Sequence, residues 1–181
     1  MPDRRSVRLR HHGYAGGLYF VTICTADRRH LFGGVADGAM RLSPAGRIAH
    51  DEWVRTGSVR RDTVRLDTFV VMPDHVHLLF GIVPPVGADA PNGADAHGRG
   101  VLQHAPTATS VRSFTSTSGD VAAAVRGYKS AVTRAVRAAH GRAVSAVWQR
   151  GYHDRVVRTQ CEADAVRRYI AYNPTRWRGD R

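Results

Sequence analysis

Two short segments, far apart in the chain, carry side chains that could together break a phosphodiester bond. His75 and His77 stand two residues apart in an apolar run, so a strand would place both imidazoles on one face. Tyr169 and Asn173 stand four residues apart, so a helix would place them on one side. Two imidazoles and an amide oxygen can share one ion, and a phenol beside that ion is a candidate nucleophile. Together they predict cleavage that leaves one end of the broken bond on the protein.

Each half of this pattern has alternatives. A histidine pair at this spacing is also typical of structural histidines or of part of a zinc site. The mixed nitrogen and oxygen set leaves positions open for phosphate and water, which favours Mg²⁺ or Mn²⁺ over a closed zinc site. Tyr152 and Tyr172 are rival nucleophiles. Tyr172 would lie about 60° from the face of Tyr169 and Asn173, and Tyr152 has no candidate ligand one helical turn away, so the spacing favours Tyr169.

The charge of the chain indicates its partner. Arginine and lysine number 27 against 15 acidic residues, a net charge of +12, and Lys129 is the only lysine. The planar guanidinium group donates two parallel hydrogen bonds to phosphate. We therefore expect a nucleic acid partner, although a basic helix face can also be simply solvated. The candidate DNA contacts are Arg10 in a basic arm, Arg126, Lys129 and Arg137 on one expected helix face, and Arg150.

Length and composition fit a single domain spanning residues 1–181, with a flexible insertion at about 83–118 that is rich in Pro, Gly, Ala, Asp, Ser and Thr. No apolar run approaches the roughly 20 residues of a membrane helix, and no signal-peptide core follows Met1. We expect a cytoplasmic, nucleoid-associated protein with no membrane contact. Cys24 and Cys161 have no zinc-site spacing and are expected to be small buried hydrophobes.

Hydrophobic periodicity and capping signals predict the order of the elements. A strand is expected over 18–25, and a helix over 44–56 begins with Ser43 as N-cap and Pro44 as first residue. Two strands, 64–72 and 75–82, should form a hairpin around Pro73-Asp74. Further along we expect a helix from residue 121, a strand over 147–157, and a final helix. That last helix opens with a capping box of Thr159 and Glu162 and ends before Pro174.

Four blocks of sequence resemble a known family. Residues 72–79 (MPDHVHLL) resemble the HUH motif, histidine-hydrophobe-histidine, of single-tyrosine transposases. Residues 127–134 (GYKSAVTR), 147–154 (VWQRGYHD) and 169–174 (YIAYNP) resemble the branch called REP-associated tyrosine transposases. The blocks occur in family order and span most of the chain. The resemblance implies an α/β (α+β) fold, a ferredoxin-like HUH nuclease domain with a central antiparallel sheet flanked by helices.

The resemblance also implies an activity. Tyr169 would be the catalytic nucleophile, and His75, His77 and Asn173 would hold Mg²⁺ or Mn²⁺. The expected reaction is metal-dependent, site-specific cleavage and rejoining of single-stranded DNA at palindromic hairpin elements, through a 5′-phosphotyrosine. The enzyme would act as a monomer or homodimer without an obligatory protein partner. The alternatives are a DNA-binding protein of the same fold without strand transfer and a metal nuclease that uses water.

Overall fold

The computed structural model describes residues 17–83, 121–141 and 146–179. Its centre is a four-stranded antiparallel sheet in the order β4-β5-β1-β6. The strands are β1 (Gly17–Cys24), β4 (Val64–Val71), β5 (His75–Ile82) and β6 (His153–Val157). The expected basic arm with Arg10 lies outside the described residues, and so does the expected insertion beyond residue 83.

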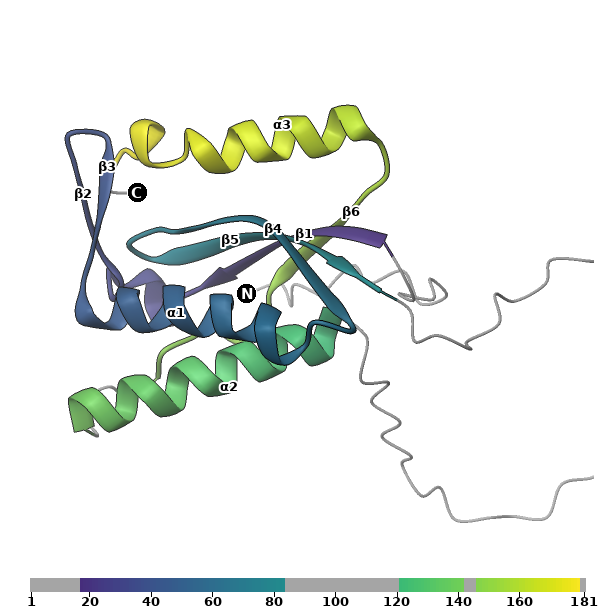
Figure 1. Ribbon diagram of the computed structural model, residues 1–181. Coiled ribbons are helices and arrows are strands. Elements are labelled where there is room, and N and C mark those ends of the chain that lie inside the picture. Colours follow the sequence, from purple (N-terminus) through teal and green to yellow (C-terminus); the bar gives the residue numbers. More distant parts are fainter. Residues whose placement is uncertain (1–16, 84–120, 142–145, 180–181) are drawn as a thin grey trace, which may run out of the picture.

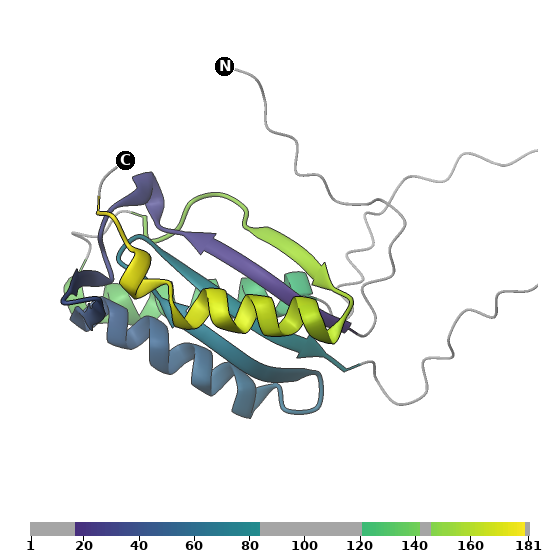
Figure 2. The same ribbon diagram turned by 90° about the horizontal axis from the view of Figure 1, so that it is seen from above.

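Three helices cover the two faces of the sheet. Figure 1 shows α1 (Pro44–Val59) and α2 (Val121–His140) below it and α3 (Gln160–Ala171) above it. Seen from above, α3 lies over the strands of the sheet (Figure 2). The strands of this sheet and the helices between them follow the order β1, α1, β4, β5, α2, β6, and β1 pairs with β5. This is the ferredoxin-like arrangement. The expected fold class is thus confirmed, with α3 as an addition on the second face.

Strict alternation along β1 separates two hydrophobic cores. Tyr19, Val21 and Ile23 are buried against the α1 and α2 side. Leu18 and Phe20 point the other way and pack against the core under α3, which contains Val166 and Ile170. Because successive strand residues face opposite sides, Thr22 must share the α3 side with Leu18 and Phe20. The same alternation decides where the histidines of β5 lie.

Helix α1 begins where the sequence predicted and runs three residues longer, to Val59. The Ser43 hydroxyl accepts a hydrogen bond from the Gly46 amide at 3.0 Å, and Pro44 occupies the first turn. Gly46 is needed because a Cβ there would lie 2.1 Å from the carbonyl oxygen of Phe32. The first turn of α1 therefore rests directly on the backbone of the preceding loop.

A two-stranded hairpin was not anticipated from the sequence. Strands β2 (Gly33–Ala36) and β3 (Ala39–Leu42) pair through a turn at Asp37 and Gly38. Both turn residues have positive φ, 54° and 71°, as two-residue hairpin turns require. The Asp-Gly dipeptide was the available signal, but the flanking strands are only four residues long and carry little alternation.

The predicted strand over 147–157 is wrong in its first half. Only His153–Val157 forms β6, and Trp148 makes an isolated bridge to Thr25. Gly151 has a φ of 80°, which directs the chain away from the sheet before β6 begins. The apolar residues Val147 and Trp148 that suggested a strand are instead packed against the core.

The capping of α3 is confirmed in half of its detail. The Thr159 hydroxyl accepts from the Glu162 amide at 3.2 Å, but the Glu162 carboxylate accepts from the amide of Arg158 rather than of Thr159.

The expectation of buried cysteines is wrong, since Cys161 is exposed on α3 and Cys24 is half-buried. Among the helices that the structure describes, none is both long and apolar enough to cross a membrane.

Candidate active site

The two histidines lie on the face of the sheet that α3 covers. Strand β5 aligns His77 opposite Thr22 of β1, and both imidazole-bearing residues are buried, with exposed fractions of 6% for His75 and 5% for His77. Val76 and Leu78, their strand neighbours, belong to the opposite core. The predicted shared face of His75 and His77 is therefore confirmed by the pleat of the strand.

Three polar atoms converge above this strand. The Nε2 atoms of His75 and His77 are 3.0 Å apart, and the Tyr169 hydroxyl lies 3.2 Å from Nε2 of His77. Tyr169 reaches down from α3 while 43% of it stays exposed to solvent. A substrate can thus approach the phenol from outside, whereas the imidazoles are sheltered beneath it.

The far nitrogen of each imidazole has its own partner. The Asp74 carboxylate lies 2.5 Å from Nδ1 of His75, and the Thr22 hydroxyl lies 2.8 Å from Nδ1 of His77. A carboxylate can only accept, so Asp74 keeps the His75 proton on Nδ1 and leaves the Nε2 lone pair facing His77. A hydroxyl can donate or accept, so Thr22 can serve either tautomer of His77. Such outer partners are typical of metal-binding histidines.

A strained stretch of backbone holds the carboxylate from its other side. Nε of Arg28 is 3.0 Å from the second carboxylate oxygen of Asp74. Arg28 and its neighbour Asp27 both have a φ near 55°, which costs free energy in residues other than glycine. Burial raises the pKa of Asp74, but the hydrogen bond to His75 and the charges of His75 and Arg28 outweigh it, so the net pKa is lowered. Asp74 is therefore a carboxylate at neutral pH.

His77 is held in its neutral form. Burial, together with the neighbouring charges of His75 and Arg28, lowers the pKa of His77 from 6.5 to about 3. A neutral imidazole keeps the lone pair that a metal ligand needs. The site therefore presents a ligand-competent nitrogen across the physiological range of pH.

Aromatic rings fix the orientation of these groups. Phe20 stacks on the ring of His77 with centroids 5.2 Å apart and meets Tyr169 edge-on at 5.9 Å. On the other side, the indole of Trp177 lies 5.8 Å from the His75 ring and 5.7 Å from that of His30. Trp177 follows the short helix η3 (Pro174–Arg176), so the segment after α3 closes one edge of the site.

The donor set suits a divalent ion with open positions. Neighbouring ligands of an octahedral ion with bonds of about 2.1 Å are about 3 Å apart, and the two Nε2 atoms are 3.0 Å apart. The described residues contain no cluster of three or more His, Cys, Asp or Glu side chains that could hold a metal. Within the part of the chain that the structure describes, a third protein ligand would therefore be of another type, as the amide of Asn173 would be.

Helix α3 ends at Ala171, so Asn173 lies two residues beyond the helix that was expected to carry it beside Tyr169. Its backbone amide donates to the carbonyl of Ile170. Its side chain is half-buried and does not cap η3. The ligand role of Asn173 stays a prediction, one that an amide not engaged in capping leaves open.

Of the predicted DNA contacts, Arg126, Arg137 and Arg150 are exposed at the surface. Lys129 has a structural role besides. Its ammonium group donates to the carbonyls of Gln149 and Gly151, at 2.9 and 3.0 Å, which ties α2 to the segment before β6. Burial lowers the pKa of Lys129. A phosphate at Lys129 would have to compete with two backbone carbonyls.

The rival tyrosines lie elsewhere. Tyr152 is half-buried against the core on the α1 and α2 side, and Tyr172 is 54% exposed beside the guanidinium of Arg176.

Sequence reasoning missed three residues of the site, Thr22, Asp74 and Arg28. Asp74 had been assigned only to a turn, although its position next to His75 was a usable signal. The position of Thr22 beside His77 follows from the register of β1 against β5. The position of Arg28 depends on a positive φ that no sequence pattern predicts.

Comparisons with known proteins add two findings, while no family model matches the chain. An uncharacterized protein of Haemophilus influenzae is 31% identical over 178 residues, which cover 98% of this chain and 91% of that protein. The solved structure of a REP-associated tyrosine transposase bound to a REP hairpin is 16% identical, with a TM-score of 0.56. The match covers 92% of this chain and 72% of that one, and at this identity it shows a shared fold.

Proposed function

Because this chain belongs to one family with the Haemophilus influenzae protein and has the fold of a REP-associated tyrosine transposase, we propose that it cleaves and rejoins single-stranded DNA. The observation that carries the proposal is the Tyr169 hydroxyl, 3.2 Å from Nε2 of a buried histidine pair. A purely structural tyrosine would be expected to bury its ring and satisfy its hydroxyl on backbone. Tyr169 instead stays 43% exposed and directs its hydroxyl at a neutral imidazole.

In the proposed reaction the Tyr169 oxygen attacks the scissile phosphorus in line. A tyrosine–phosphorus bond forms and the bond to the 3′ oxygen breaks, giving a 5′-phosphotyrosine and a free 3′-OH. The phenol loses one proton and the leaving oxygen gains one, so no net proton is consumed. Because one phosphoester replaces another, a second 3′-OH can reverse the step and join strands without ATP.

The remaining groups position the substrate. His75, His77 and Asn173 would hold Mg²⁺ or Mn²⁺, which when bound supplies Lewis-acid stabilisation of charge on the phosphate. Asp74 and Thr22 keep the imidazoles oriented, and Phe20 keeps the His77 ring and the phenol in contact. The exposed side chains of Arg126, Arg137 and Arg150, together with Arg10 of the basic arm, would contact the phosphate backbone.

The substrate class follows by the same proposal. The solved transposase of the same fold is bound to a REP hairpin, so we expect a single strand flanked by a hairpin stem. An exposed phenol over buried imidazoles fits a strand whose backbone can bend into the site, which a continuous duplex cannot do without unpairing.

The test is a denaturing gel of labelled hairpin oligonucleotides incubated with the protein and Mg²⁺ or Mn²⁺. We expect a slower, protease-sensitive band that disappears in Tyr169→Phe and His75→Ala. Tyr172→Phe, which alters an exposed tyrosine of the same helix end, is the matched control and should keep the band. Cleavage that survives in Tyr169→Phe without a linked band would favour a water-using nuclease. Binding with no cleavage under any condition would favour a DNA-binding protein.

A further inference from the structure

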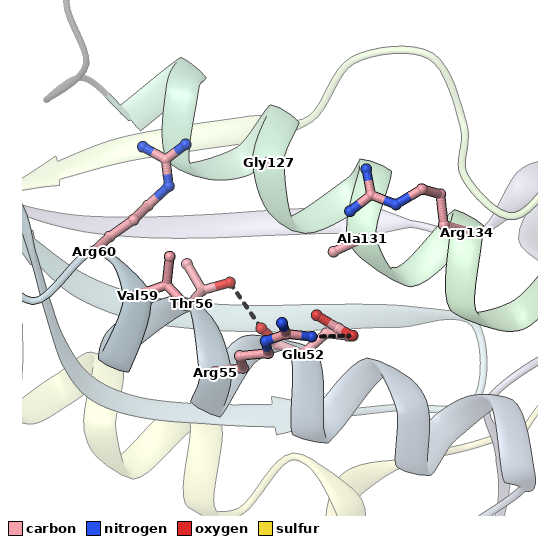
Figure 3. A pocket seen from close by; sticks show the side chains of 8 residues that line it. All are labelled: Glu52, Arg55, Thr56, Val59, Arg60, Gly127, Ala131 and Arg134. Atoms are coloured by element: carbon pink, nitrogen blue, oxygen red, sulfur yellow. Dashed lines mark hydrogen bonds and ion pairs between the residues drawn. The ribbon is translucent and has the colours of Figure 1, made fainter.

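A second feature lies on the opposite side of the sheet from the histidines. A groove of about 230 Å³ runs between α1 and α2, lined by residues of both helices (Figure 3). Helices α1 and α2 cover one face of the sheet and α3 covers the other (Figure 1), so this groove and Tyr169 lie on opposite sides of the sheet.

The groove is positively charged. Arg55 and Arg60 line it from α1 and the residue after it, Arg134 lines it from α2, and Glu52 is the single carboxylate among the lining residues. Nη1 of Arg55 lies 3.8 Å from Oε1 of Glu52, which is the distance of a weak surface ion pair. Three guanidinium groups against one carboxylate leave an excess of two positive charges at the groove.

A glycine in the middle of α2 accommodates one of these arginines. A Cβ at Gly127 would lie 3.2 Å from Nη2 of Arg60, so the guanidinium rests close to the helix surface where another residue would carry a side chain (Figure 3). Glycine inside a helix costs about 1 kcal/mol relative to alanine. The close approach of Arg60 gives that cost a structural reason, because it keeps a cation at the groove.

The lining identifies the chemistry of the ligand. Guanidinium groups suit phosphate, to which they donate paired hydrogen bonds. None of the described residues that line the groove is aromatic, so they offer unpaired bases no ring on which to stack. Such a surface reads the backbone and not the bases. These properties fit double-stranded DNA, whose bases are already stacked inside and whose phosphates face outward.

We propose that the groove between α1 and α2 binds the phosphate backbone of duplex DNA, at a site separate from the strand that is cut. Arg55, Arg60 and Arg134 contact the phosphates, and the contact is independent of sequence. The protein would then engage two segments of DNA with two faces of one sheet. This inference goes beyond the proposed chemistry and does not depend on Tyr169.

The test is fluorescence anisotropy with a labelled blunt duplex that has no single-stranded end, without divalent metal, over a range of salt concentrations. For the double variant Arg55→Gln/Arg134→Gln we expect about tenfold weaker binding. The slope of log affinity against log salt should become shallower by about 1.8, from two lost phosphate contacts. Both side chains are exposed, so the fold should be unaffected, which a melting curve checks.

The matched control is Arg41→Gln/Arg158→Gln, which removes the same charge from exposed positions elsewhere. It should leave binding within about twofold and the slope nearly unchanged. A second variant, Gly127→Leu, fills the groove without changing the charge and should weaken duplex binding as the double variant does. Equal losses in control and groove variants would overturn the proposal, as would duplex binding unaffected by Arg55→Gln/Arg134→Gln. Neither result would bear on cleavage at Tyr169.

Discussion

At the scale of single residues, the function proposed for this protein depends on how two imidazoles are held. Asp74 and Thr22 each bond one Nδ1 atom, which leaves the two Nε2 atoms facing one another. Neither residue touches the proposed phosphodiester. We therefore expect substitutions of Asp74 or Thr22 to act mainly on the affinity of the two imidazoles for metal.

Asp74→Asn should weaken Mn²⁺ binding by about 10- to 100-fold, because an amide cannot hold the His75 proton on Nδ1 as a carboxylate does. Electron paramagnetic resonance of free Mn²⁺ measures this directly. Asp51→Asn is a suitable control, since Asp51 also bonds Nδ1 of an adjacent histidine, the exposed His50, at 2.9 Å. Equal Mn²⁺ affinity in the two variants would contradict a positioning role for Asp74.

The neutral state of His77 predicts a dependence of stability on pH. Its pKa is about 3 in the folded protein and 6.5 in the unfolded chain, so between these values the unfolded state binds the extra proton. The free energy of unfolding must therefore fall as the pH drops from about 6.5 toward 3. In His77→Gln this contribution is absent.

The measurement is urea unfolding of wild type and His77→Gln at pH 7 and pH 5, without metal. We expect the variant to gain stability relative to wild type at the lower pH. A difference in stability that does not change with pH would show that His77 is not held neutral.

At the scale of the elements, close backbone contacts determine where helices lie. In Gly46→Ala, helix propensity alone favours the alanine. The new Cβ would lie 2.1 Å from the Phe32 carbonyl oxygen, so we expect a loss of at least about 2 kcal/mol instead. Thermal melting checks this, with Gly34→Ala as control, because a Cβ at Gly34 has no neighbour within 4 Å. A stabilised Gly46→Ala protein would show that α1 can shift away from the loop.

Lys129 tests which of two roles a basic side chain has. Its ammonium group bonds two carbonyls of the segment before β6, so Lys129→Met should lower stability by about 1–2 kcal/mol. It should leave the salt dependence of DNA binding unchanged. Chemical denaturation and salt titration measure both quantities. A shallower salt slope with unchanged stability would instead make Lys129 the phosphate contact that its sequence position suggests.

The elements that the sequence predicted well are those with local signals. The Ser43 and Thr159 caps mark helix starts that the structure contains, and runs of β-branched, aromatic and other apolar residues mark β1 and β5. The hairpin β2–β3 was missed because its strands are too short for alternation to be visible. The strand before β6 was overextended, since Val147 and Trp148 are apolar for packing and Gly151 turns the chain.

At the scale of the whole molecule, the sheet separates two surfaces. One carries the histidine pair under α3, and the other carries the arginine groove between α1 and α2. The proximity of His77 and Tyr169, 92 residues apart, was implied by the family resemblance, because strand and helix periods fix only which side chains share a face within one element. The groove could not be anticipated, because its arginines come from two helices whose packing is set by tertiary contacts alone.

The proposed chemistry is tested most directly by mapping the covalent bond. The protein is incubated with a hairpin oligonucleotide and Mn²⁺, the DNA is trimmed with nuclease, and peptides are analysed by mass spectrometry. We predict a nucleotide attached through its 5′-phosphate to the peptide containing Tyr169, and none on Tyr152 or Tyr172. Cleaved DNA with no modified tyrosine, or a nucleotide on either of the other two, would contradict the assignment of Tyr169 as the nucleophile.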